Sequence, residues 1–224
     1  MRPNIIFFLI DGLRADQCFG KDKTSFTPNI DSLRKKGTYF TNAFSSVDGT
    51  LLSLSAIFHS LYPIETPKSR IKLTLQKNNL FDILVKNDYE INGLVAKLLA
   101  FTDIINYFEN NDKTYDYFKD MNKMNNFLLT NSSGLTDEII QFLKSRTSKK
   151  PWFYYIHNFT LHPLKEYYAS YDSKRSLLAH GIKDFNHEKF GSSLYERTVS
   201  WIDHELGKIL EHVDLDNTIL ILTS

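Results

Sequence analysis

Three short and almost uninterrupted apolar runs constrain the fold of this chain more than any other feature. They read NIIFFLI, WFYYIH and TILILT and occupy residues 4–10, 152–157 and 218–223. A continuous apolar run of this length is typical of a strand that is buried on both faces, as in a parallel sheet. Residues 89–95 also look like a strand.

The segments between these runs have the spacing and end signals of helices. Thr27 is a good N-cap residue, Pro28 suits the first helical position, and Gly37 provides a stop. Ser193 and Glu196 form a capping-box signature before the longest apolar stripe. We therefore expect helices over residues 28–36, 50–58, 79–85, 135–143 and 194–213, and one more strand over residues 38–43. Alternating strands and helices predict an α/β fold, with a mainly parallel sheet covered by helices on both faces.

Composition excludes several classes of partner. The 224 residues have 42% hydrophobic content and a formal net charge of +1, so no global field attracts nucleic acid or an anionic membrane. Cys18 is the single cysteine, which rules out an intrachain disulfide. The sequence has no apolar run long enough to span a membrane and no signal-peptide pattern at its start. We therefore expect a cytoplasmic protein.

Two side chains at predicted element ends are candidates for metal chemistry. Asp11 follows the first strand, where a parallel sheet keeps its ligands, although an aspartate here is also a common turn residue. Thr50 begins a helix, where free N–H groups favour phosphate or sulfate oxygens. A bound metal would make its hydroxyl a nucleophile, whereas the ordinary alternative is a threonine N-cap.

Two histidines follow the WFYYI run. His157 and His162 stand where a side chain can bind metal, stabilise an oxyanion or protonate a leaving group. The alternative is that each is a packed or surface residue.

Taken in order, these segments resemble the sulfatase family and its relatives in the alkaline phosphatase superfamily. The resemblance covers nearly the whole chain and is carried by PNIIFFLIDGLRAD, TPNIDSLRKKGTYFTNAFS, TLLSLSAIFHSLYP, YIHNFTLHP, YERTVSWIDHELGKILEHV and DNTILILTS. It implies an alkaline phosphatase-like fold. It also implies that Asp11 is a metal ligand, that Thr50 is both metal ligand and nucleophile, and that His162 is catalytic. His157 and Arg14 would contact the substrate.

Departures from the family pattern narrow the expected reaction. Sulfatases that use formylglycine carry Cys or Ser followed by x-Pro-x-Arg, whereas Thr50 is followed by Leu-Leu-Ser-Leu. Threonine resembles instead the phosphoethanolamine and phosphoglycerol transferases. Gly12 stands where many sulfatases have a second aspartate, which favours zinc or manganese over calcium. His162 is followed directly by Pro163 rather than by one residue and then proline.

We therefore expect a metal-dependent transferase or hydrolase of phosphate esters, with glycan- or lipid-linked substrates. The alternatives are a sulfate ester hydrolase and a non-catalytic binding protein. In the family, the strand that resembles residues 218–223 precedes an Asp-His or Asp-Asn pair that completes the metal site. Residues 1–224 are accordingly expected to form a sulfatase-like catalytic domain that is incomplete at its C-terminus.

Overall fold

The fold is built on one parallel sheet. The computed structural model describes residues 2–66, 71–111, 113–115, 133–161 and 183–224. The strands are β1 (Asn4–Ile10), β2 (Glu90–Ala96), β3 (Thr114–Tyr115), β4 (Trp152–Asn158) and β5 (Thr218–Thr223). They lie in the order β3-β2-β4-β1-β5, and every neighbouring pair is parallel. The strands expected over residues 4–10, 89–95, 152–157 and 218–223 are confirmed, and β1 lies between β4 and β5.

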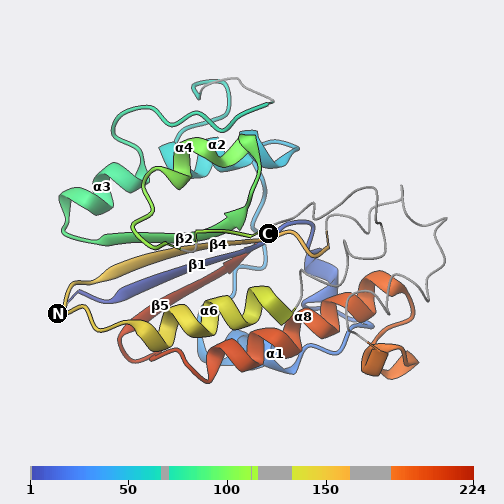
Figure 1. Ribbon diagram of the computed structural model, residues 1–224. Coiled ribbons are helices and arrows are strands. Elements are labelled where there is room, and N and C mark those ends of the chain that lie inside the picture. Colours follow the sequence, from blue (N-terminus) through green and yellow to red (C-terminus); the bar gives the residue numbers. More distant parts are fainter. Residues whose placement is uncertain (1, 67–70, 112, 116–132, 162–182) are drawn as a thin grey trace, which may run out of the picture.

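Helices cover both faces of this sheet, which confirms the predicted α/β architecture. Figure 1 shows α2, α3 and α4 on one face and α1, α6 and α8 on the other. Their bounds are α1 Pro28–Lys36, α2 Thr50–His59, α3 Leu80–Lys86, α4 Thr102–Ile105, α6 Ser133–Ser145 and α8 Leu194–Leu210. Short 3-10 helices occupy Ala15–Gln17, Leu99–Phe101, Lys183–Phe185 and Glu188–Phe190. None of the described helices is both long enough and apolar enough to cross a bilayer.

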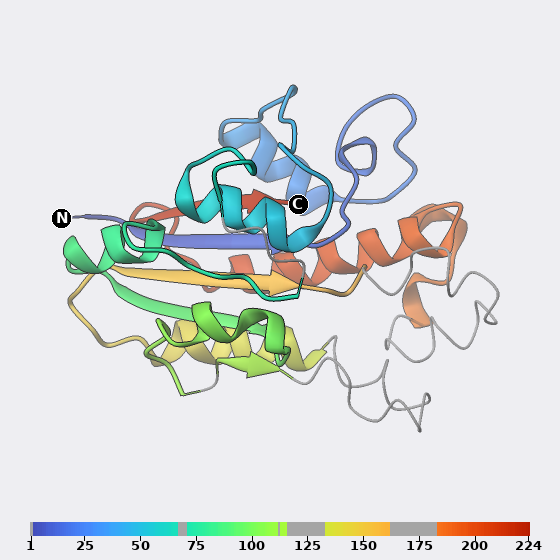
Figure 2. The same ribbon diagram turned by 90° about the horizontal axis from the view of Figure 1, so that it is seen from above.

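Helix α2 lies over the middle of the sheet (Figure 2), and aromatic side chains hold it there. Phe58 of α2 lies with its ring centroid 5.4 Å from that of Tyr155 on β4 and 4.8 Å from that of Phe81 on α3. All three side chains are fully buried. Edge-to-face and tilted ring pairs of this kind add to the free energy gained by burial. The first turn of α2 is thereby held at a defined place beside the carboxyl ends of β1 and β4.

The strand expected over residues 38–43 does not form. These residues run as turn and irregular backbone between α1 and α2, and no described strand pairs with them. Phe40 is 74% exposed and Phe44 is 88% exposed. A strand needs a pairing partner and a buried face, and this segment has neither in the described structure, so its local β propensity is overridden.

The start of α1 is capped by a residue from α8 rather than by the predicted Thr27. Thr27 occupies the N-cap position, but its side chain makes no capping hydrogen bond. Asp203 instead accepts hydrogen bonds from the backbone N–H groups of Asn29, at 3.1 Å, and Ile30, at 2.7 Å. The Thr27 hydroxyl is buried and has no hydrogen-bond partner among the described residues. A carboxylate distant in sequence thus performs the capping role.

Replacing Asp203 with alanine is expected to lower the free energy of unfolding by about 2–4 kcal/mol, because it leaves two buried N–H groups at the start of α1 without acceptors. The measurement is urea denaturation followed by circular dichroism. Thr27→Val is the matched control, and it should change stability little because it removes a buried hydroxyl that has no partner. A larger loss for Thr27→Val than for Asp203→Ala would show that threonine is the effective cap.

Candidate active site

Asp11 is positioned by the end of β1. Its backbone N–H donates to the Asn158 carbonyl oxygen at 2.9 Å, which extends the β1–β4 pairing by one residue. Gly12 then adopts a φ of +84°, a conformation that side chains with a Cβ rarely adopt. The chain turns sharply here, and the Asp11 carboxylate lies at the carboxyl edge of the sheet.

Thr50 meets this carboxylate from the start of α2. Its Oγ1 donates a hydrogen bond to Asp11 Oδ2 at 3.0 Å. Thr50 is the first residue of the helix, and Gly49, with a φ of +91°, is the N-cap. Thr50 is therefore not an N-cap threonine, because its hydroxyl is committed to Asp11 across 39 residues of sequence.

His157 lies on the buried side of Asp11. Its side chain is fully buried, its ring is stacked on Phe159 with centroids 4.2 Å apart, and its Nε2 lies 3.6 Å from Asp11 Oδ2. The Tyr155 hydroxyl lies 2.9 Å from His157 Nδ1. Burial, with a further contribution from the Asp11 charge, raises the pKa of Tyr155 well above its ordinary value. Tyr155 therefore keeps its proton, and its hydroxyl shares a hydrogen bond with His157 Nδ1 that helps to fix the ring beside Asp11.

The other two site residues expected from the sequence, Arg14 and His162, are not among the residues that the structure places beside Asp11. The Arg14 side chain is 66% exposed and pairs with Asp16, its Nε lying 3.0 Å from Asp16 Oδ1. His162 lies outside the described residues. The structure thus brings together Asp11, Thr50 and His157, and the burial of His157 favours a role in holding Asp11 over direct contact with a substrate.

Sequence reasoning missed Tyr155. The signal that could have found it is its spacing, because residues two apart on a strand face the same side of the sheet. Tyr155 and His157 on β4 meet this condition.

The donor types at this edge suit a divalent cation. Asp11 supplies carboxylate oxygens and Thr50 a hydroxyl oxygen, and these converge within 3.0 Å. Hard and borderline cations prefer such oxygen ligands, and zinc usually takes three or four ligands from the protein. Within the described residues, His, Cys, Asp and Glu form no group of three or more that could hold a metal. Asp11 and Thr50 therefore fit as part of a metal site.

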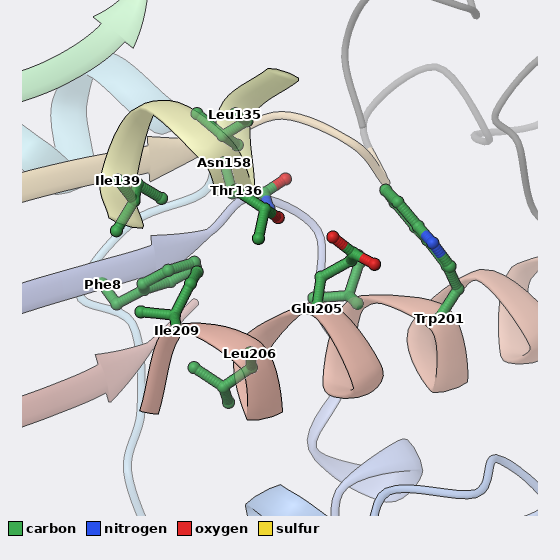
Figure 3. Close-up of a pocket in the computed structure, with 10 residues that line it drawn as sticks. Phe8, Leu135, Thr136, Ile139, Asn158, Trp201, Glu205, Leu206 and Ile209 are labelled. Carbon is green, nitrogen blue, oxygen red and sulfur yellow. The ribbon is translucent and has the colours of Figure 1, made fainter. Parts of the chain in front are cut away.

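A separate pocket lies between the sheet and helices α6 and α8, on the face of the sheet away from α2 (Figure 3). Its empty space is about 270 Å³, part of it open to solvent. The lining residues are Phe8, Leu135, Thr136, Ile139, Asn158, Trp201, Ile202, Glu205, Leu206 and Ile209. Its one carboxylate, Glu205, is paired with Lys208 at 2.6 Å. Because Asn158 and His157 are neighbours on one strand, their side chains point to opposite faces, so the sheet separates this pocket from Thr50.

Comparison with known proteins decides the family. The model of the sulfatase family matches residues 3–224. The chain belongs to the sulfatase family. An ulvan-active sulfatase from Formosa agariphila is 39% identical over 66 residues, which cover 29% of this chain and 13% of that protein. An uncharacterised protein from Haemophilus influenzae is 23% identical over 232 residues, covering 100% of this chain and 31% of that protein. The chain thus spans less than a third of these curated relatives.

Solved structures share this fold at low sequence identity. Ps i-CgsB superposes with a TM-score of 0.67 at 20% identity, covering 100% of this chain and 58% of that one. The phosphonate monoester hydrolase of Agrobacterium radiobacter gives 0.66 at 14% identity, covering 99% and 62%. The zinc complex of the periplasmic domain of EcEptC from Escherichia coli gives 0.60 at 14% identity, covering 100% and 64%. At 14–20% identity these likenesses show a shared fold, and the chain spans 58–64% of the length of these solved structures.

Proposed function

We propose that this sulfatase-family chain carries the nucleophile of a metal-dependent phosphate ester transferase or hydrolase, and that the nucleophile is Thr50. The observation that carries the proposal is the 3.0 Å hydrogen bond from Thr50 Oγ1 to Asp11 Oδ2 at the first turn of α2. It puts a hydroxyl, a carboxylate and a helix N-terminus in one place at the carboxyl edge of a parallel sheet. This is where α/β sheets hold their ligands.

In the proposed reaction, Thr50 is the nucleophile and Asp11 orients its hydroxyl. Thr50 Oγ1 forms a bond to phosphorus while the bond between phosphorus and the departing alcohol oxygen breaks. Asp11 Oδ2 fixes the direction of the Thr50 hydroxyl proton, which leaves the oxygen lone pairs free to attack. The Thr50 proton passes along its hydrogen bond to Asp11 Oδ2 during this attack. Water or an acceptor alcohol then attacks the phosphorus of the Thr50 ester, and its proton replaces the one that the acid gave to the departing alcohol. The bond between phosphorus and Thr50 Oγ1 breaks, and Asp11 returns the proton to Thr50. A divalent metal held by Asp11 and Thr50 would lower the pKa of the hydroxyl.

The backbone of α2 would stabilise the transferred group. The first N–H groups of a helix have no acceptor within the helix, and the helix dipole favours negative charge there. Gly49 has no side chain, and open space surrounds the position that a Cβ would occupy, so the group's oxygens could approach these N–H groups. His162 is proposed as the acid that protonates the departing oxygen, as the family pattern implies.

Phosphate is proposed as the preferred group because Thr50 cannot become formylglycine and lacks the Pro and Arg that follow formylglycine sites. Sulfate esters are the second candidate, since the curated relatives include proteins named as sulfatases. One solved neighbour is in complex with neocarrahexaose, which favours including glycan esters among the substrates. Zinc or manganese is proposed over calcium, because Gly12 replaces a second carboxylate.

The test is a substrate panel on the intact natural protein with zinc, manganese or calcium added. The panel contains aryl phosphate mono- and diesters, an aryl sulfate and a sulfated oligosaccharide. We expect turnover of a phosphate ester at least about tenfold faster than that of any sulfate. Faster sulfate hydrolysis would establish the sulfatase alternative. No turnover with any substrate, together with the absence of bound metal by elemental analysis, would establish a binding protein without catalysis.

A further inference from the structure

One side chain of α8 makes two hydrogen bonds to the turn that follows Asp11. The Tyr195 hydroxyl donates to the Gly12 carbonyl oxygen at 2.7 Å and accepts from the Arg14 backbone N–H at 2.9 Å. We propose that Tyr195 is a positioning residue, which holds this turn so that the Asp11 carboxylate faces Thr50. This role deepens the function proposed for Asp11 and Thr50 and rests on it.

The turn needs such support because fixing a glycine in one conformation has a high entropic cost. Gly12 has a φ of +84°, and glycine loses more conformational freedom on folding than any other residue. On its near side, the turn is tied to β4 by the bond from Asp11 N–H to Asn158 and is closed by a bond from Leu13 N–H to the Ile10 carbonyl oxygen at 3.2 Å. On the side of the turn away from β4, the Tyr195 hydroxyl bonds to both the Gly12 carbonyl oxygen and the Arg14 N–H. Removing it would leave the side away from β4 without these two bonds.

Tyr195 itself stands on a well-defined helix start. The capping box at the start of α8 is complete: the Ser193 hydroxyl accepts from the Glu196 N–H at 3.3 Å, and the Glu196 carboxylate accepts from the Ser193 N–H at 2.7 Å. Burial alone would raise the pKa of Glu196, but the hydrogen bonds from Ser192 and Ser193 lower it to about 2. The cap is therefore ionised and intact at neutral pH, and the residue it flanks is fixed in place.

The Tyr195 hydroxyl keeps its proton under the same conditions. Burial raises the pKa of Tyr195 to about 12, although the hydrogen bond from Arg14 opposes this change. A protonated hydroxyl can donate to Gly12 and accept from Arg14 together, which a phenolate could not. Both hydrogen bonds of the Tyr195 hydroxyl are therefore compatible with neutral pH.

The experiment compares Tyr195→Phe with Tyr89→Phe. The control removes the same kind of bond elsewhere, because the half-buried Tyr89 donates its hydroxyl proton to the Pro3 carbonyl oxygen at 2.9 Å. Amide hydrogen exchange of Arg14, followed by NMR in the 224-residue chain, should become about tenfold faster in Tyr195→Phe, as expected for the loss of one hydrogen bond. The methyl resonance of Thr50, assigned through Thr50→Ser, should shift in the same variant. Tyr89→Phe should change neither signal.

In the intact active protein, Tyr195→Phe should lower kcat about tenfold with little change in KM, because misplacing the nucleophile affects the transition state more than substrate binding. Wild-type Arg14 exchange, an unmoved Thr50 resonance or an unchanged kcat in Tyr195→Phe would each overturn the proposal. The exchange and methyl measurements do not depend on catalysis. A failure of the proposed function would instead appear as undiminished turnover in Thr50→Ala, with the Arg14 exchange still accelerated in Tyr195→Phe.

Discussion

Thr50→Ala is expected to reduce turnover by at least about three orders of magnitude, which is the scale seen when a covalent nucleophile is removed. The reason is that Thr50 Oγ1 is the hydroxyl held by Asp11 at the first turn of α2. The measurement is steady-state hydrolysis of the best phosphate ester by the intact protein. Metal content should fall much less, because Asp11 remains.

Two variants control for this result. Thr50→Ser keeps the hydroxyl and should retain a substantial part of the activity. Ser53→Ala removes a hydroxyl one turn further along α2, where it donates to the Val47 carbonyl oxygen at 3.0 Å, and should leave turnover nearly unchanged. Near-normal turnover in Thr50→Ala would eliminate the threonine nucleophile and with it the proposed mechanism.

Asp11→Asn is expected to weaken the binding of zinc or manganese by at least about 100-fold, more than is typical when only a partner of a metal ligand is changed. Asparagine has the same shape, and its amide oxygen can still accept from Thr50, so the fold should persist. Bound metal is measured by elemental analysis and by titration calorimetry, and circular dichroism reports the helical content.

Asp16→Asn is the matched control for the metal experiment. Asp16 lies five residues further on, is 43% exposed and pairs with Arg14, so its loss should leave metal affinity unchanged. Equal affinity in Asp11→Asn and the wild-type protein would remove Asp11 from the metal site. An equal loss in both variants would point to general attraction by negative charge rather than to coordination.

The sequence predicted most of the framework that carries the site. The runs that became β1 and β4 are apolar on both faces and mostly buried, as in a parallel sheet covered by helices on both sides. The run that became β5 is equally apolar, but β5 lies at the edge of the described sheet, where Ile219 and Ile221 are 50% and 39% exposed. The capping box at Ser193 and Glu196 is equally local, since both bonds form within one helical turn, and it is present as expected. The positions of Asp11 after a strand and Thr50 at the start of a helix are likewise indicated by local signals.

Other features depended on contacts between distant segments. Residues 38–43 have the composition of a strand but find no partner in the described sheet. Thr27 has the chemistry of an N-cap, yet the carboxylate of Asp203 reaches the same N–H groups from another helix. Local propensities amount to about 1 kcal/mol or less per residue, and a tertiary hydrogen bond or the lack of a pairing strand outweighs them.

The sequence by itself determined the fold class and the family, and it predicted Asp11 and Thr50 as site residues, because periodicity, caps and ordered motifs are properties of neighbouring residues. Only the tertiary structure decided that the Thr50 hydroxyl bonds to Asp11, that His157 is buried behind this carboxylate, and that Tyr195 holds the turn from 183 residues away. These are relations of distance and direction between elements that the sheet brings together. They follow from which strands pair and where each helix packs, which no single segment of the chain specifies.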